Sequence, residues 1–70
     1  MISYTKLFSL LVLRGIKAYE LQEMISTSAA TMAKIKKGEQ INTGVICRIC
    51  AALNVQPGDI MEFIPDEKTE

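Results

Sequence analysis

The sequence predicts an all-α fold, a compact five-helix bundle formed by one small domain. Apolar residues recur three and four positions apart through most of the 70 residues, whereas period-two alternation is never sustained. Two glycines, Gly15 and Gly38, stand where left-handed residues can end helices. The chain is 49% hydrophobic, which suits one core and is too rich for a disordered chain. We therefore expect a domain over residues 1–65 and a frayed acidic tail over residues 66–70.

The first helix is expected to end at Gly15 and to lie at the centre of the bundle, because it is apolar nearly all round. The second helix opens at Lys17 and turns Leu21 and Ile25 inward. The apolar positions of the first helix are Tyr4, Leu7, Phe8, Leu10, Leu11, Val12 and Leu13.

The third helix is predicted over residues 29–37. Ser28 precedes it and is a good N-cap, because its hydroxyl can accept a hydrogen bond from a free backbone N–H of the first turn. Met32 and Ile35 lie one turn apart and should face inward. The outer face is then slim and small, with lysines toward its end: Ala29, Ala30, Ala33, Lys34 and Lys37. Such a face suits a helix that enters the major groove of DNA.

The fourth helix should begin at Asn42 or Thr43 and run to Leu53. Pro57 favours a short fifth helix that reaches Glu62, because proline is preferred in a first helical turn. Residues 62–65 are at best a short edge strand. The expected core is Leu7, Phe8, Leu11, Leu21, Ile25, Met32, Ile35, Val45, Ile46, Ile49, Leu53 and Ile60.

The net charge of zero hides a segregation along the chain. Residues 1–48 carry seven lysines and arginines against three glutamates (7 − 3 = +4), and residues 49–70 carry one lysine against five acids (1 − 5 = −4). Phosphate binding needs local rather than total positive charge, so a neutral chain can still bind DNA.

The two cysteines, Cys47 and Cys50, form a CxxC motif. Zinc needs four ligands, and the chain has no histidine and no second cysteine pair, so we expect no metal. Cys50 falls on the apolar stripe of the fourth helix and is interpreted as a small core residue.

The order of helices and loops resembles the Cro and phage-repressor (Xre-type) helix-turn-helix regulators, roughly from Leu7 to Met61. The ending LNVQPGDIMEFIPDE resembles a subgroup of very small bacterial regulators. The positions that match the pattern are Leu21, Ile25, Thr27, Ser28, Thr31, Met32, Ile35, Gly38, Leu53, Asn54, Val55, Asp59, Ile60 and Met61. The resemblance implies a lambda-repressor-like DNA-binding fold and a sequence-specific repressor that inserts helix 29–37 into the major groove.

Two positions depart from the family pattern. Ser26 stands where the family has a turn glycine, and serine in a left-handed conformation costs on the order of 1 kcal/mol unless its hydroxyl makes a local bond. Gln22 stands where a small alanine lets the two helices approach.

The resemblance also implies the DNA-binding residues. Ala29, Ala30 and Lys34 occupy base-reading positions, with Ala33 beside them, and alanine methyls can contact thymine methyls. The other DNA-binding residues implied by the resemblance are the helix cap and positions that contact phosphates in the family: Ala18, Tyr19, Ser28, Thr31, Lys37, Gln40, Asn42 and Thr43. The alternative is that the lysines simply form a solvated face.

We expect no enzyme, since the chain lacks histidine and a GxxxxGK phosphate loop. We expect a cytoplasmic protein with no cofactor, no small-molecule substrate and no membrane partner. The competing function is a protein-interaction module or an antitoxin-like adaptor on the same fold.

A homodimer on double-stranded DNA is the expected working species, because a single recognition helix covers few bases. Met61, Phe63 and Ile64 could form its interface, or they could fold back on the N-terminus of a monomer.

Overall fold

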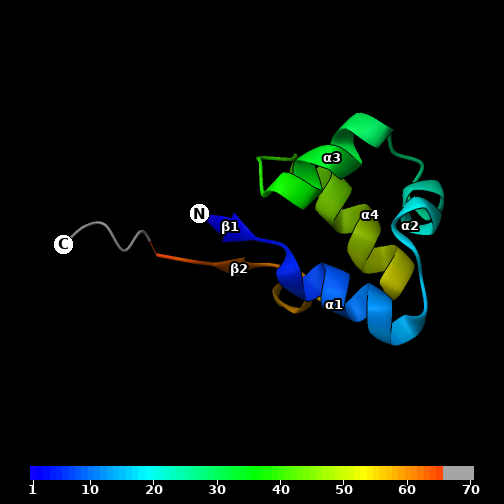
Figure 1. Cartoon of the computed structure of the whole chain (residues 1–70), viewed down its shortest axis with the longest axis horizontal. Helices are drawn as coiled ribbons and strands as arrows, with labels where there is room; N and C mark the ends of the chain where they lie inside the picture. Colours follow the sequence, from blue (N-terminus) through cyan, green and yellow to red (C-terminus); the bar gives the residue numbers. More distant parts are fainter. Residues whose placement is uncertain (66–70) are drawn as a thin grey trace.

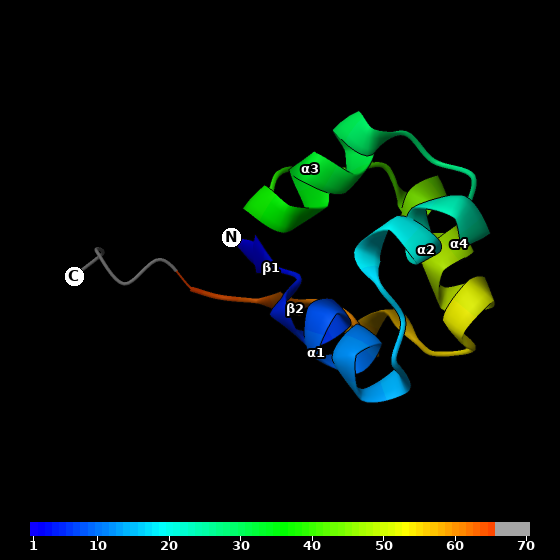
Figure 2. The same ribbon diagram turned by 45° about the vertical axis from the view of Figure 1, so that its right-hand side comes forward.

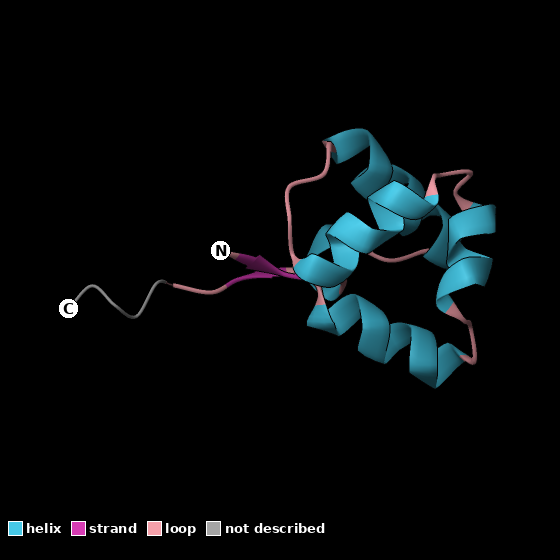
Figure 3. Cartoon of the chain, turned by 45° about the horizontal axis from the view of Figure 1, so that its top comes forward, coloured by secondary structure: helices cyan, strands magenta, loops and turns pink. Residues whose placement is uncertain are grey.

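A computed structural model, which describes residues 1–65, contains four α-helices, one 3-10 turn and a two-stranded ribbon (Figures 1 and 3). The elements in chain order are β1 (Ile2–Ser3), α1 (Thr5–Arg14), α2 (Ala18–Met24), α3 (Ala29–Lys37), α4 (Thr43–Leu53), η1 (Pro57–Asp59) and β2 (Glu62–Phe63). The predominantly helical class is confirmed, and the tail expected over residues 66–70 lies outside the described residues.

The prediction of five helices was wrong, since the fifth element is the single 3-10 turn η1. Pro57 begins it as expected, and the amides of Ile60 and Met61 both donate to the Pro57 carbonyl at 3.1 Å. Ile60 is then fully buried, and the chain extends immediately to pair with the N-terminal strand. A longer helix is excluded because residues 62–64 are used in that pairing.

The two strands form an antiparallel ribbon in which Ile2 lies opposite Phe63. The Ile64 amide donates to the Met1 carbonyl at 2.7 Å, and the Met1 ammonium donates to the Ile64 carbonyl at 2.8 Å. The ribbon lies at the end of the molecule away from α2 (Figures 1 and 2). β2 lies within residues 62–65, which were expected to form at best a short edge strand. β1 was not predicted as a strand, because two residues carry too little period-two signal.

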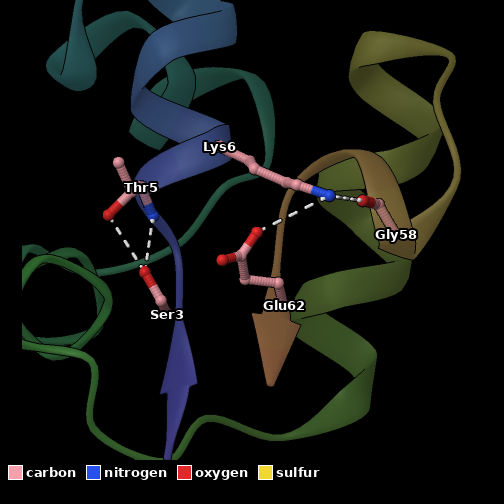
Figure 4. A network of polar contacts seen from close by, with 5 residues as sticks. All are labelled: Ser3, Thr5, Lys6, Gly58 and Glu62. Carbon is pink, nitrogen blue, oxygen red and sulfur yellow. Dashed lines mark hydrogen bonds and ion pairs between the residues drawn. The ribbon is translucent and has the colours of Figure 1, made fainter. Parts of the chain in front are cut away.

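A polar network ties the start of α1 to the C-terminal segment (Figure 4). Lys6 Nζ donates to the Gly58 carbonyl at 3.0 Å and lies 3.8 Å from Glu62 Oε1. Ser3 Oγ accepts from the Thr5 amide at 3.3 Å and lies 3.0 Å from the Thr5 hydroxyl. The network therefore joins β1, α1, η1 and β2 at one end of the molecule.

Each of the four α-helices contributes buried residues to the core, and Ile60, which follows η1, is buried in it as well. Ten of its eleven buried residues were expected, and Tyr4 is the addition. Phe8 and Ile46, also expected in the core, are half-buried and pack against it. The buried residues are Tyr4, Leu7, Leu11, Leu21, Ile25, Met32, Ile35, Val45, Ile49, Leu53 and Ile60.

The first helix was predicted to be central, and this was wrong. Leu7 and Leu11 are buried, but Val12 is 79% exposed and Leu13 is 83% exposed. In Figure 1, α1 and α3 lie on opposite sides of the molecule, so α1 lies at the edge of the bundle and not at its centre. A bundle this small has no further layer to cover the outer apolar residues of α1.

Candidate nucleic-acid interface

The helices α2 and α3 are joined by a four-residue turn, residues 25–28. The turn satisfies its own backbone donors: the Ser26 amide donates to the Glu23 carbonyl at 3.2 Å, and the Thr27 amide to the Gln22 carbonyl at 3.1 Å. Ser26 has φ of 52°, the left-handed conformation expected at this position. The two helices and their turn form a helix-turn-helix unit, in which α3 lies on the side of the molecule opposite α1 (Figure 1).

Ser28 caps α3 as predicted. Its Oγ accepts from the Thr31 amide at 3.1 Å, and the Ser28 hydroxyl also donates to Thr31 Oγ1 at 3.2 Å. Since both bonds serve the cap, the side chain of Ser28 holds the first turn of α3 in place. The cap fixes where that helix begins.

The two faces of α3 separate as the spacing predicts. Met32 is 4% exposed and Ile35 is 1% exposed, so these two side chains anchor the helix to the core. The residues that are fully on the surface are Ala29, Ala30, Ala33, Lys34, Lys36 and Lys37. The outer face of α3 is therefore both slim and positively charged.

The positive charge of α3 is not neutralised within residues 1–65. The ion pair in this part of the chain joins Lys6 to Glu62, so no described carboxylate lies within 4.0 Å of the Lys34, Lys36 or Lys37 ammonium. Lysines in the last turn also interact favourably with the negative end of the helix dipole. Within residues 1–65 these ammonium groups therefore have no carboxylate partner.

The loop after α3 brings several predicted residues together. Asn42 Oδ1 accepts from the Val45 amide at 3.0 Å and so caps α4. A surface hollow separates this loop from α3, and four of its lining residues were predicted to contact DNA. The lining residues are Thr31, Lys34, Gln40, Ile41, Asn42 and Val45. Thr43 follows as the first residue of α4 and is exposed.

Ala18 and Tyr19 stand apart from that hollow. Both lie in the first turn of α2, where Tyr19 is 60% exposed and Ala18 is half-buried. Ala18 borders a different hollow, together with Phe8 and Ile16. The structure thus divides the predicted site into a main cluster along α3 and its following loop and a separate pair at the start of α2.

Arg48 is a residue that the sequence interpretation did not assign to the site. From α4, its Nη1 donates at 3.1 Å to the carbonyl oxygen of Ile25, the first residue of the turn and the C-cap of α2. The partners are 23 positions apart, so no local pattern signals the contact. Arg48 entered the sequence interpretation through the count of positive charges alone.

Fewer positive side chains are available on the surface than the charge count for residues 1–48 suggests. Lys6 binds Gly58 and Glu62, and Arg14 donates to the carbonyl of Leu53. Arg48 binds Ile25. Three of the seven cations of residues 1–48 therefore serve intramolecular contacts, and the cluster on α3 carries most of the remainder.

The two cysteines of α4 differ in their exposure to solvent. Cys47 is exposed and Cys50 is half-buried, and burial raises the pKa of the Cys50 thiol, with smaller contributions from Cys47 and Asp59. Within residues 1–65 no group of three or more His, Cys, Asp or Glu side chains is arranged to hold a metal ion. No helix in the same part of the chain has the length and apolar character needed to cross a bilayer.

Three similarities to known proteins agree with this geometry. Residues 6–66 match the family model of the Cro/C1-type HTH DNA-binding domain. The chain is 36% identical over 62 residues to YozG, an uncharacterised HTH-type transcriptional regulator of Bacillus subtilis (strain 168), covering 86% of this chain and 74% of that protein. It superposes on the crystal structure of the transcriptional regulator VanUg (Form II) with a TM-score of 0.89 and 42% identity, covering 93% of this chain and 87% of that one. The chain therefore belongs to the family of Cro/C1-type helix-turn-helix DNA-binding domains.

Proposed function

We propose that this DNA-binding transcriptional regulator is a cytoplasmic, sequence-specific repressor that places α3 in the major groove and acts as a homodimer. The observation that supports it most directly is the outer face of α3. This face is exposed, built from alanine and lysine, and free of described ion-pair partners.

The exposed alanines make α3 narrow enough to approach base edges closely. Ala29, Ala30 and Ala33 can contact thymine methyl groups but cannot donate hydrogen bonds. Lys34 is the long polar side chain among these positions, and it is proposed to read bases directly. A single lysine discriminates few bases by direct readout, so DNA shape would contribute to the choice of binding site.

Phosphate contacts are proposed for the residues around the hollow and beyond it. Lys37, Gln40 and Thr43 are exposed, and the N-terminus of α4, capped by Asn42, presents backbone N–H groups and the positive end of the helix dipole. Tyr19, in the first turn of α2, is proposed as a further phosphate contact. These contacts would set the register of α3 without reading sequence.

A dimer is proposed because α3 has nine residues and spans roughly 13 Å, which covers few base pairs. Two copies related by a two-fold axis would reach half-sites about 34 Å apart. Ile64 is half-buried, and its backbone pairs with that of Met1, as in the fold-back alternative to a dimer through this segment. Phe63 remains 68% exposed and is the residue we propose for the dimer contact.

An adaptor that binds a protein partner is the second candidate function. The observation that favours it is the exposed apolar pair Val12 and Leu13. Both belong to α1, which lies opposite α3 in the molecule (Figure 1). Exposed apolar surface of this kind is typical of protein contacts. Such a contact is compatible with DNA binding through α3, since the two surfaces are separate.

Substitution of the α3 lysines tests the DNA-binding surface. Lys34→Ala should weaken binding to the duplex that the protein selects from a random library, whereas Lys37→Ala should weaken binding to all duplexes alike. Removing one lysine that binds a phosphate should lower the salt slope of binding by about 0.9. Fluorescence titration at two or more salt concentrations measures both quantities.

Lys6→Ala is the matched control, because it removes an equal charge from the ribbon end of the molecule. It should leave the salt slope unchanged once its folded fraction is verified. If the double substitution at Lys34 and Lys37 leaves affinity for every tested duplex unchanged, α3 is not the DNA-binding helix.

Sedimentation of the free protein tests the dimer and its proposed contact. We expect a dimer at tens of micromolar, and Phe63→Glu should convert it to a monomer by placing a charge in an apolar contact. Ile64 and the ribbon hydrogen bonds are untouched by this change. A wild-type monomer at that concentration, unaltered by Phe63→Glu, would exclude a preformed dimer through this surface.

A further inference from the structure

A side chain of α4, that of Arg48, makes a hydrogen bond to the turn between α2 and α3. Arg48 Nη1 donates to the Ile25 carbonyl at 3.1 Å, and Ile25 itself is buried, with 3% exposure. A guanidinium bond to a carbonyl is charge-assisted and stronger than a neutral one. The residue that ends α2 is thus fixed both by its side chain in the core and by its carbonyl oxygen.

The next residue in the turn is the one with an unfavourable backbone. Ser26 has φ of 52°, a conformation in which a side chain is disfavoured. Its hydroxyl makes no hydrogen bond within residues 1–65, so the side chain does not stabilise this conformation locally. The Arg48 contact lies immediately before this residue, where it can restrain the peptide that leads into the left-handed position.

The direction in which α3 leaves the turn depends on these few residues. Two positions separate Ser26 from the first residue of α3, and Ser28 then caps that helix. A change in the Ser26 backbone would therefore tilt the whole outer face of α3 relative to α4.

We propose that Arg48 is a positioning residue for DNA recognition, whose bond to Ile25 holds the Ser26 turn and thereby sets the angle of α3. This inference rests on the proposed use of α3 as the DNA-binding helix. Arg48 acts through the turn rather than by touching DNA. It supports a turn in which serine replaces the glycine expected there.

Arg14 offers a matched control within the same chain. It also extends from a helix and donates to a backbone carbonyl, that of Leu53. This contact joins α1 to the end of α4 and involves neither the turn nor α3. Arg14→Met and Arg48→Met therefore remove the same chemistry from two places, and only Arg48 touches the recognition unit.

The first experiment needs no DNA. Hydrogen exchange of the Ser26 and Thr27 amides is compared in the wild type, Arg48→Met, Arg48→Lys and Arg14→Met. We expect Arg48→Met to speed this exchange about tenfold, as the removal of one charge-assisted bond implies. Arg48→Lys should restore much of the protection, and Arg14→Met should change none of it. Unchanged exchange in Arg48→Met, or equal acceleration in Arg14→Met, would overturn the proposal.

The second experiment measures binding to a duplex selected from a random library by the wild-type protein, and to a scrambled duplex of equal length. For the folded protein, Arg48→Met should bind the selected duplex about threefold to tenfold more weakly, with an unchanged salt slope. The scrambled duplex should bind nearly as before. Equal weakening on both duplexes with a slope lower by about 0.9 would make Arg48 a phosphate contact and overturn the proposal.

The variant Ser26→Gly tests the link to the turn and covers the case in which Arg48→Met folds poorly. Glycine relieves the backbone, so Arg48→Met in the Ser26→Gly background should show a smaller drop in affinity and in amide protection than in the wild type. Equal drops in both backgrounds would overturn the proposal. If the wild type selects no duplex, the proposed function fails, while the exchange experiment still decides whether Arg48 holds the turn.

Discussion

The two ends of α3 are both reached through a left-handed residue, yet one is serine and the other is glycine. Ser26 precedes the helix with φ of 52°, and Gly38 ends it with φ of 74°. At Gly38 a Cβ atom would lie 3.3 Å from the Ile2 carbonyl oxygen, so the backbone of β1 leaves little room for a side chain. Ser26, in contrast, is exposed to solvent.

This difference separates two reasons for needing glycine. The dihedral angle alone imposes a modest cost, which a tether such as the Arg48 bond can offset. Close approach of a backbone segment, as of β1 to Gly38, adds a steric cost that a hydrogen bond elsewhere does not relieve. A side chain is therefore accommodated at Ser26, before α3, whereas the C-terminal end of α3 at Gly38 lies against the backbone of β1.

The largest effect is expected for Ile35→Ala, because Ile35 anchors α3 between its two ends and is 1% exposed. The cavity and the reduced packing around it should lower the free energy of unfolding by about 2–5 kcal/mol. Urea unfolding followed by circular dichroism measures this change. A decrease below about 1 kcal/mol would mean that the caps alone position α3.

A smaller decrease is expected for Gly38→Ala, which should lower the free energy of unfolding by about 2 kcal/mol through the left-handed backbone and the Ile2 contact. Thermal unfolding gives the value. Gly58→Ala is the control, since nothing lies within 4 Å of a Cβ at that position and its φ is not positive. Similar decreases at the two glycines would remove the distinction drawn for Gly38.

The smallest effect, and of opposite sign, is expected for Ser26→Gly. It should raise the free energy of unfolding by up to about 1 kcal/mol, because glycine adopts a positive φ freely. Ser9→Gly, in the interior of α1, should instead destabilise the protein by about 0.5–1 kcal/mol. A destabilised Ser26→Gly would show that the serine is not strained.

Sequence patterns predicted the helices whose signals are local. Ser28 was predicted as a cap, Asn42 was one of two candidates with Thr43 for the start of the fourth helix, and Gly15 and Gly38 were predicted as helix ends. Each of these signals depends on residues within a few positions. The fifth helix and the central position of α1 were wrong. Both depend on what the distant ends of the chain do, and a helical stripe does not reveal which other elements exist to cover it.

The predicted site residues on α3 form one exposed face because helical periodicity places them there. Their roles in binding stay predictions. The Arg48 contact could not be predicted, since it joins positions 23 apart and depends on how α4 crosses the turn. The same limit applies to Lys6 and Arg14, whose charges looked available for DNA in the sequence but are engaged with carbonyl groups.

The ribbon also has a consequence for the order in which the chain folds. The contact between Met1 and Ile64 spans 63 positions, so it forms only after synthesis has passed residue 64. Until then β1 has no partner strand. The pairing with β2 that positions Ile2 close to Gly38 is therefore absent. Closing so long a loop carries an entropic cost that local contacts avoid. The ribbon can therefore form only after almost all of the described chain has been synthesised, and it is then that β1 acquires its partner strand.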